Sequence, residues 1–241
     1  MGTAVVIDNI SKIYQNNRGV KNLSLEINDG EIFGFLGPNG AGKTTAMKIM
    51  VGLMRPDGGD VKINGFSVLS DYENAMKRVG CIIESVTPFA YLTAYENMKL
   101  RARYYAGADD ARIDTCLAEA GILKYKREKV KNYSLGMKQR IGLALAMLSN
   151  PKILILDEPL NGLDVEGMVE MRNLILRLSR ENKTTFFISS HLIHDIELTC
   201  DKIGLLYDGR LLSVDSTENI LKNYSSLENY YLSEVEPSVN S

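Results

Sequence analysis

A glycine-rich segment, Gly37-Pro-Asn-Gly-Ala-Gly-Lys-Thr44, constrains the fold of this chain more than any other feature. It matches the pattern GxxxxGK[ST] at every fixed position, follows a short apolar run at 31–36 and opens a run with helical periodicity. Glycines let successive backbone N–H groups converge on one point, and the start of a helix adds a positive end there. The pattern therefore predicts a strand, a phosphate-binding loop and a helix, which is the beginning of an α/β domain.

The residues around this loop suit a nucleotide. Lys43 offers a mobile cation to phosphate oxygens, and the hydroxyl of Thr44 can ligate Mg²⁺. A glycine-rich turn without a ligand is the alternative, and the strand-to-helix context disfavours it. We expect the nucleotide to be held by Gly37, Pro38, Asn39, Gly40, Ala41, Gly42, Lys43, Thr44 and Thr45.

Two acids follow a second apolar run, Ile153-Leu-Ile-Leu156. A strand this apolar is expected near the centre of a sheet, and open α/β sheets bind ligands at the carboxyl edge of their strands. There Asp157 could hold Mg²⁺, and Glu158 could polarise the water that attacks a γ-phosphorus. An Asp-Glu pair alone is often a solvated turn, but beside a phosphate loop it predicts a hydrolytic site.

The order of strands and helices predicts a mixed chain with one helical insertion. Strands and helices alternate up to residue 84 and again from 151, which implies a largely parallel sheet covered on both faces, whereas 85–150 contain helices alone. We expect a core of residues 1–84 and 151–215, a helical part at 85–150 and a polar tail at 216–241 with a peripheral helix. Expected strands are 3–8, 20–28, 31–36, 60–66, 79–83, 152–156, 184–189 and 203–207; expected helices outside the insertion are 44–54, 70–78, 165–182 and 192–199.

Composition excludes several classes of protein. The formal net charge of −2 provides no basic field, so nucleic acid is not expected as a partner. No apolar run approaches the roughly 18 residues needed to span a bilayer, and the N-terminus lacks the apolar stretch of a signal peptide. Cys81, Cys116 and Cys200 are far apart without metal-ligand spacing, and we interpret them as small, reduced, buried residues.

Further motifs resemble those of ABC transporter ATP-binding subunits. Tyr133-Ser-Leu-Gly-Met-Lys-Gln-Arg140 resembles a variant of the LSGGQ signature, Asn161-Gly-Leu-Asp164 resembles the D-loop, and Ser190-His191 resembles the H-loop. Ser134 precedes Asp157 by 23 residues, as in the family. The resemblance covers about residues 3–215. It implies an α/β P-loop NTPase (RecA-like) core with a small N-terminal antiparallel β sheet and an inserted helical subdomain.

The resemblance also implies roles for single residues. In this family two subunits pair head to tail, and ATP with Mg²⁺ is held between the loop of one and the signature of the other. Tyr14 would stack on adenine. The implied catalytic residues are Glu158, His191 and Glu84, the implied metal ligands are Thr44, Asp157 and Glu84, and the implied further nucleotide contacts are Ser134, Gly136 and Asp164.

Glu84 departs from the family pattern. The family usually has Gln at the end of the strand that leads into the helical insertion, where it touches Mg²⁺ and relays movement to the membrane subunit. A carboxylate can still coordinate Mg²⁺, but it cannot donate a hydrogen bond while ionised. A solvated loop glutamate without function is the alternative.

The surroundings of Glu84, the signature and the segment Leu92-Thr-Ala-Tyr-Glu-Asn-Met98 resemble exporters that protect bacteria against peptide antibiotics, of the bacitracin-resistance and lantibiotic self-immunity types. The family resemblance implies a second ATPase subunit and a separate integral membrane permease, at the cytoplasmic face of the cell membrane. We expect a homodimer, and a heterodimer is the alternative. Residues 85–105 are expected to offer a groove for a permease helix. Tyr91, Tyr95 and Met98 are either contacts in this groove or core residues.

Other functions would share part of this set of motifs. An exporter of another amphipathic substrate or of a lipid would share all the motifs, and an importer subunit is disfavoured by the surroundings of Glu84. A soluble ABC ATPase acting on DNA or ribosomes usually carries two cassettes or a long coiled-coil insertion, and this chain has one cassette and neither addition. A nucleotide-dependent kinase would share the phosphate loop but has no use for the signature.

Overall fold

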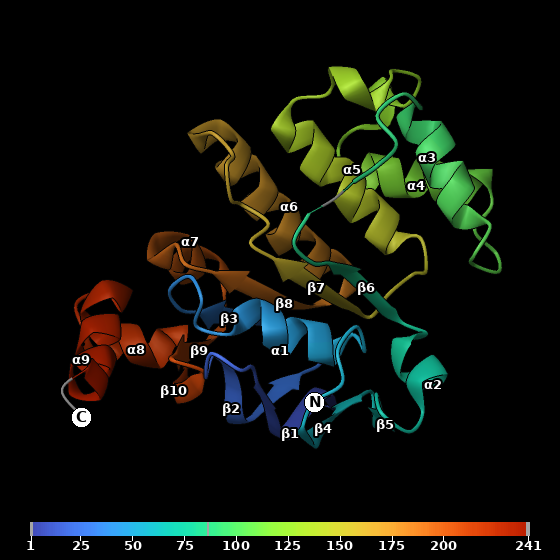
Figure 1. Ribbon diagram of the computed structural model, residues 1–241. Coiled ribbons are helices and arrows are strands. Elements are labelled where there is room, and N and C mark those ends of the chain that lie inside the picture. Colours follow the sequence, from blue (N-terminus) through green and yellow to red (C-terminus); the bar gives the residue numbers. More distant parts are fainter. Residues whose placement is uncertain (1, 86, 240–241) are drawn as a thin grey trace.

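Two β-sheets pack against the helix that begins at the glycine-rich loop (Figure 1). The structure, a computed structural model, describes residues 2–85 and 87–239. The smaller sheet has the order β2-β1-β4-β5 and is antiparallel. Its strands are β1 (Thr3–Ile13), β2 (Gly19–Asn28), β4 (Gly58–Ile63) and β5 (Phe66–Ser67).

The larger sheet has the order β10-β9-β3-β8-β7-β6, and every neighbouring pair except β9 and β10 is parallel. Helices cover one face and α1 (Lys43–Met50) with the smaller sheet covers the other, so strands β3 and β7 are buried along their full length. The strands are β3 (Ile32–Leu36), β6 (Val79–Ile82), β7 (Ile153–Asp157), β8 (Thr185–Ser190), β9 (Lys202–Tyr207) and β10 (Arg210–Ser216).

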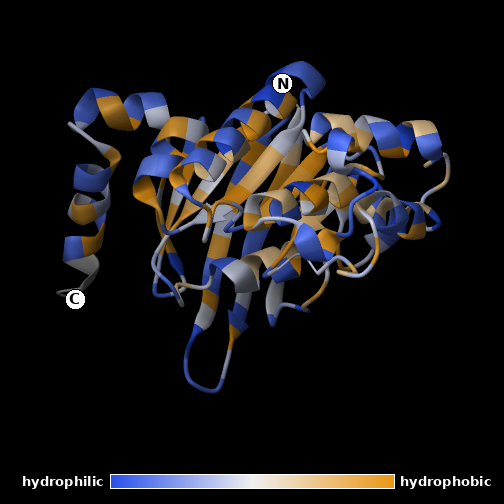
Figure 2. Cartoon of the chain, turned by 90° about the horizontal axis from the view of Figure 1, so that it is seen from above, coloured by the Kyte–Doolittle hydropathy of each residue, from blue (hydrophilic) through white to orange (hydrophobic). Residues whose placement is uncertain are grey.

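Successive side chains of β7 point to opposite faces of the sheet and pack into two different hydrophobic cores. Ile153 and Ile155 pack with α1 and the smaller sheet, while Leu154 and Leu156 pack with the helices on the opposite face. Figure 2 shows the resulting distribution, with hydrophobic strands inside and hydrophilic residues on the outer helices. The end of β7 therefore delivers Asp157 to the carboxyl edge of a fully covered sheet.

The segment between β6 and β7 forms a helical lobe, at the upper right of Figure 1. Thr93 and Glu96 form a reciprocal capping box at the start of α3, and Ser134 caps α5 through its hydroxyl. The helices of this lobe are α3 (Ala94–Ala102), α4 (Asp110–Glu119) and α5 (Leu135–Met147), with short 3₁₀ turns at Leu123–Tyr125 and Val130–Asn132. The remaining helices are α2 (Tyr72–Met76), α6 (Val165–Asn182), α7 (Ile193–Thr199), α8 (Thr217–Asn223) and α9 (Leu227–Val239).

The expected fold class is confirmed, with local corrections. The predicted strand at 60–66 is a hairpin, because Asn64 and Gly65 have positive φ and turn the chain between β4 and β5. The predicted helix at 44–54 ends at Met50, and Gly52 follows with φ +69°. Cys81 is exposed, so its interpretation as a buried residue is wrong, whereas Cys116 and Cys200 are buried.

The polar tail is more ordered than expected. It forms two helices, α8 and α9, instead of one, and Leu227 and Tyr230 of α9 are buried. Tyr230 lies edge-on to Tyr224, with ring centroids 5.1 Å apart. The tail therefore packs on the body of the protein, where Figure 1 shows it in red beside β9 and β10.

Candidate nucleotide site

The glycine-rich loop runs from the end of β3 to the start of α1. Gly42 has φ +110°, and a Cβ atom there would lie 2.4 Å from the carbonyl oxygen of Gly19. A Cβ atom at Gly37 would lie 2.3 Å from the carbonyl oxygen of Leu206. Both positions exclude a side chain, because the colliding atoms belong to the backbone. The loop is thus fixed in shape by its neighbours on β2 and β9.

Lys43 holds its ammonium group inside this loop. The residue is 5% exposed, and its Nζ donates hydrogen bonds to the carbonyl oxygens of Gly37 at 2.6 Å and Pro38 at 3.3 Å. Its Nζ also lies 3.2 Å from Oε1 of Glu158. A buried ammonium needs such partners, and together they aim its charge at the centre of the loop.

Asp157 connects three segments at the carboxyl edge of the sheet. Its Oδ2 accepts hydrogen bonds from Oγ1 of Thr44 at 2.9 Å and from the backbone N–H of Glu84 at 3.3 Å. Its Oδ1 accepts from Oγ of Ser189 at 2.6 Å. Hydroxyl and carboxylate oxygens are ligands that Mg²⁺ prefers. The pair Thr44 and Asp157 therefore fits a Mg²⁺ ion.

Such an ion would need ligands from outside the protein as well. Among residues 2–85 and 87–239, no group of three or more His, Cys, Asp and Glu side chains gathers closely enough to hold a metal. Mg²⁺ commonly takes one or two protein ligands and completes its coordination with phosphate oxygens and water. The donor set at Thr44 and Asp157 matches this mode of binding.

Glu158 lies between the loop and His191. Its backbone adopts φ +49°, and its N–H donates to Oγ of Ser189 at 3.0 Å. Its Oε2 lies 2.8 Å from Nδ1 of His191, while its Oε1 faces Lys43. A carboxylate held between an imidazole and an ammonium, with 20% of its side chain exposed, is positioned to act on a water molecule.

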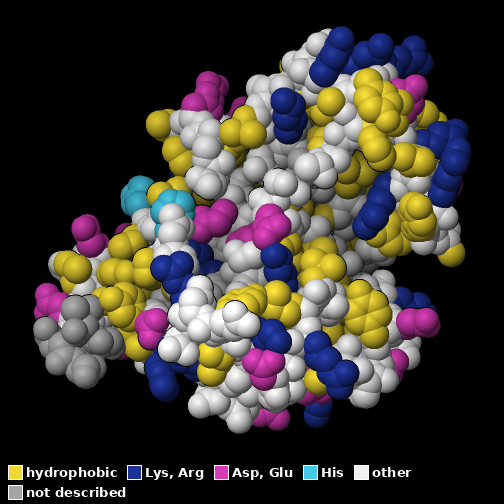
Figure 3. Space-filling model, viewed as in Figure 1, with side chains coloured by type: hydrophobic (Ala, Val, Ile, Leu, Met, Phe, Trp, Pro, Cys, Tyr) yellow, Lys and Arg dark blue, Asp and Glu magenta, His cyan; other side chains and the backbone are white. Residues whose placement is uncertain are grey.

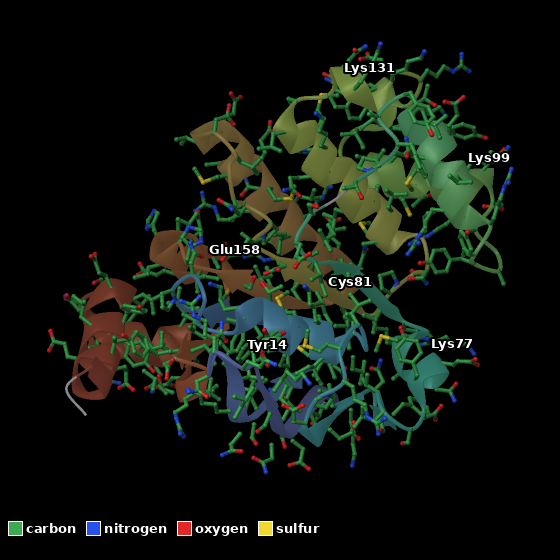
Figure 4. All side chains as sticks on the ribbon, in the orientation of Figure 1. Tyr14, Lys77, Cys81, Lys99, Lys131 and Glu158 are labelled. Atoms are coloured by element: carbon green, nitrogen blue, oxygen red, sulfur yellow. The ribbon has the colours of Figure 1, made fainter. Side chains whose placement is uncertain are left out.

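Tyr14 lies at the open side of the loop. A cavity of about 360 Å³ is lined by Tyr14, Arg18, Lys43 and Glu158 together with loop residues and Thr44 and Thr45. The hydroxyl of Tyr14 donates to Sδ of Met54 at 3.2 Å, and the residue is 38% exposed. Its ring can therefore stack on a planar base. In Figure 4, Glu158 is labelled above α1 and Tyr14 below it.

The signature and the D-loop form a second, separate edge. Ser134 accepts a hydrogen bond from the N–H of Met137 at 3.2 Å, and Asp164 accepts from the N–H of Gly167 at 2.9 Å, so both cap helices. A Cβ atom at Gly162 would lie 3.2 Å from Cδ2 of Leu135, which shows that the two motifs are neighbours. Figure 1 shows the start of α5 in the upper part of the molecule, away from the loop before α1. One chain does not bring Ser134, Gly136 and Asp164 to the phosphate loop.

A groove lies between the helical lobe and the rest of the chain. It has a volume of about 560 Å³, and its walls include Leu53, Phe89, Leu100, Arg101 and Tyr104. Figure 3 shows hydrophobic side chains on both sides of the hollow at the right of the view.

The three residues predicted for this groove do not form its walls. Tyr91 is 66% exposed beside Phe89, with ring centroids 6.0 Å apart. Met98 is fully buried, and Tyr95 packs against the core. Met98 and Tyr95 therefore belong to the core alternative, and Tyr104 and Leu100 provide the exposed apolar surface instead.

Two residues of the site were missed from the sequence. Ser189 is fully buried and joins Asp157 to Glu158, but its place depends on the register in which Asp157 pairs with Ser189 across β7 and β8. Lys48 forms an ion pair with Glu84, which depends on how α1 packs beside the end of β6. The sequence did offer one signal for Lys48: it follows Thr44 by four residues in a predicted helix, which places both side chains on the same face.

Comparison of the sequence with known proteins identifies a family and several relatives. The model of the family described as ABC transporter matches residues 20–161. The uncharacterized ABC transporter ATP-binding protein YhcH of Bacillus subtilis is 40% identical over 238 residues, which are 99% of this chain and 77% of that protein. The bacitracin transport ATP-binding protein BcrA of Enterococcus faecalis is 41% identical over 212 residues, which are 88% of this chain and 69% of that protein.

Two further similarities extend this result. The lantibiotic transport ATP-binding protein SrtF of Streptococcus pyogenes is 36% identical over 217 residues, which are 89% of this chain and 93% of that protein. A dimeric ATP-binding cassette solved in a post-hydrolysis state with ADP and Pi has a TM-score of 0.77 and 27% identity, covering 88% of this chain and 98% of that one. Within the described part of this chain, no helix has both the length and the apolar character that crossing a bilayer requires.

Proposed function

The chain belongs to the ABC transporter family as an ATP-binding and ATP-hydrolysing subunit, and from this premise we propose that its active site is completed by a second copy. The observation that carries the proposal is the separation of two formed half-sites. One contains the phosphate loop, Asp157, Glu158 and His191, and the other contains Ser134, Gly136 and Asp164. A head-to-tail pair would place each half-site against the complementary half-site of its partner.

In this proposal the loop and α1 bind the triphosphate, and Tyr14 stacks on adenine. Lys43 would exchange its carbonyl partners for β- and γ-phosphate oxygens, with the positive end of α1 behind it. Mg²⁺, held by Thr44 and Asp157, would supply charge neutralisation at the phosphates. The start of α5, with the hydroxyl of Ser134 and the backbone at Gly136, would contact the γ-phosphate from the other copy.

Hydrolysis in this proposal depends on Glu158. Its carboxylate, oriented by Ser189 at the backbone and by His191 and Lys43 at the side chain, would accept a proton from the attacking water. His191 would hydrogen-bond the γ-phosphate and help close the site. Transfer of Lys43 from Glu158 to the phosphates would free Oε1 of Glu158 for the water.

The partner and cargo are proposed from the relatives. BcrA is described as a bacitracin transport protein and SrtF as a lantibiotic transport protein, and this chain is 41% and 36% identical to them. We propose that a homodimer drives a separate membrane permease at the cytoplasmic face and exports a peptide antibiotic of these types. The groove beside Tyr104 and Leu100 would receive a helix of the permease. Export of another amphipathic substrate or a lipid is the second candidate, because all the motifs would be shared.

Expression in antibiotic-sensitive cells tests this function. The chain is produced together with the membrane permease that it is proposed to drive, and the minimal inhibitory concentrations of bacitracin and of a lantibiotic are measured, with Lys43→Ala as the matched inactive control. We expect resistance to rise only with the active chain, and the permease to co-purify with it. Co-purification with ribosomes or DNA in place of a permease would contradict the proposal, and unchanged sensitivity to both peptides would exclude this cargo.

Glu84→Gln tests the departure from the family pattern. Gln keeps the length and can donate a hydrogen bond, so we expect a modest change in ATPase of the isolated chain and a larger one in the resistance of cells. Glu73→Gln, which removes an exposed carboxylate on α2, is the control. Equal resistance at equal expression would leave Glu84 as a loop residue without function.

Gly136→Ala tests whether a ligand approaches the signature backbone. Within one chain the new methyl group would have 3.8 Å to its nearest neighbour, Cδ2 of Leu163, and alanine stabilises a helix by about 1 kcal/mol or less relative to glycine. We therefore expect an unchanged or higher melting temperature together with a loss of ATPase of about tenfold, because the phosphate contact is displaced. Full ATPase in this variant would show that the backbone at Gly136 is not approached closely.

A further inference from the structure

Glu84 is paired with a lysine on the helix that follows the phosphate loop. Nζ of Lys48 lies 2.5 Å from Oε1 of Glu84, with 28% of the lysine side chain and 64% of the glutamate side chain exposed. Lys48 is four residues after Thr44 on α1, so both side chains lie on the same face of the helix. The ion pair therefore flanks the pair Thr44 and Asp157.

The backbone of Glu84 is anchored at the same place. Its φ is +66°, a left-handed conformation that is unfavourable for a residue with a Cβ atom. Its N–H donates to Oδ2 of Asp157, the oxygen that also accepts from Thr44. One backbone bond to Asp157 and one side-chain pair with Lys48 thus hold Glu84 in this conformation.

Before Mg²⁺ binds, the carboxylates at this edge need a cation besides Lys43. Asp157 and Glu84 are both acids beside the site proposed for a triphosphate, and like charges in close proximity disfavour one another. The ammonium of Lys43 is already committed to Glu158 and to the carbonyl oxygens of the loop. Among the ion pairs of the described residues, Lys48 is the only cation joined to Glu84.

Lys48 is suited to this task. A lysine side chain is ordinarily an ammonium at neutral pH, and the ion pair with Glu84 favours that charged form. Each outer carboxylate of the site thus has its own ammonium partner: Glu158 pairs with Lys43, and Glu84 pairs with Lys48. Asp157 lies between these two ion pairs.

We propose that Lys48 is a positioning residue: its ammonium neutralises Glu84 and ties the segment after β6 to α1, which allows a second carboxylate to stand beside Asp157. This inference rests on the proposed function in placing the triphosphate at this edge. It makes a specific prediction: Lys48 should no longer be needed when Glu84 is replaced by a neutral residue.

A double-mutant cycle tests this prediction with four proteins: the parent chain, Lys48→Met, Glu84→Gln and the combination of both. We expect Lys48→Met to lower kcat/KM for Mg-ATP about fivefold when Glu84 is present. We expect less than about a twofold effect in the Glu84→Gln background, because a neutral side chain needs no counter-ion. Met retains the unbranched aliphatic character of Lys without the charge.

A second measurement, nucleotide binding without Mg²⁺, does not depend on the metal or on ATP hydrolysis. Binding of a fluorescent ATP analogue in EDTA should weaken with Lys48→Met in the parent and much less in the Glu84→Gln background, since an uncompensated carboxylate repels the triphosphate. Lys48→Arg, which keeps the charge, should restore both kcat/KM and binding. Thermal unfolding of all variants separates these effects from a loss of folded protein.

The outcomes distinguish this inference from the function it rests on. Equal losses from Lys48→Met in both backgrounds, or no loss in either, would overturn the role of Lys48 while leaving the nucleotide site intact. Failure of the parent chain to bind ATP at all would instead overturn the proposed function.

Discussion

Replacement of Glu158 by Gln is expected to lower ATP turnover by about two to four orders of magnitude while nucleotide binding is kept. Gln has nearly the same shape and can still meet His191 and the loop, but it cannot accept a proton from water. Closure of the site would then be separated from hydrolysis. With Mg-ATP the variant should accumulate as a dimer in size-exclusion chromatography, and without nucleotide it should elute as the parent chain does.

The matched control for this experiment is Glu73→Gln. It removes the same charge from an exposed position on α2 and should keep full turnover with no trapped dimer. A Glu158→Gln protein that hydrolyses ATP at the parent rate would contradict the assignment of the general base. A protein that loses turnover and ATP affinity together would point to a binding role for Glu158 instead.

Lys43→Ala is expected to weaken ATP binding by about two orders of magnitude or more. The buried ammonium is the cation inside the phosphate loop, and its loss also leaves the carboxylate of Glu158 facing the same space. Isothermal titration calorimetry with Mg-ATP measures the effect. Turnover at sub-saturating ATP should fall by at least as much.

Lys77→Ala, at the exposed end of α2, is the control for lost positive charge and should leave affinity unchanged. Lys43 has partners inside the fold, so thermal unfolding in the absence of nucleotide measures separately how its removal changes stability. An unchanged affinity for ATP in a folded Lys43→Ala protein would refute the role of the loop as the phosphate site.

Much of the fold follows from sequence patterns because the strongest signals are local. The apolar runs that become β3 and β7 are buried on both faces, so they carry almost no polar residues. Strand β10 is absent from the expected strands. It follows a turn at Asp208 and Gly209, both with positive φ, but its mixed residues are only partly buried and give no clear alternation. Its pairing with β9 depends on the sheet edge and not on its own pattern.

The candidate site was predictable where one motif supplies several residues. Lys43 and Thr44 share the loop that defines the site, and Asp157 follows the strand beside it. Ser189 and Lys48 carry no motif of their own, and their contacts arise only when β7 pairs with β8 and α1 packs near the end of β6. The roles of Ser134, Gly136 and Asp164 stay predictions, because their partner would be another chain.

The central claim, a site shared between two copies, is tested most directly by mixing two inactive variants. Lys43→Ala destroys the phosphate loop and keeps the signature. Ser134→Asp destroys the signature by placing a carboxylate against the γ-phosphate, yet Asp caps a helix as well as Ser does. A mixed dimer would contain one intact site, so equal amounts should recover about a quarter of the parent ATPase if the copies pair at random. Activity that stays at the average of the two variants would show that each site is built from a single chain and would contradict the account.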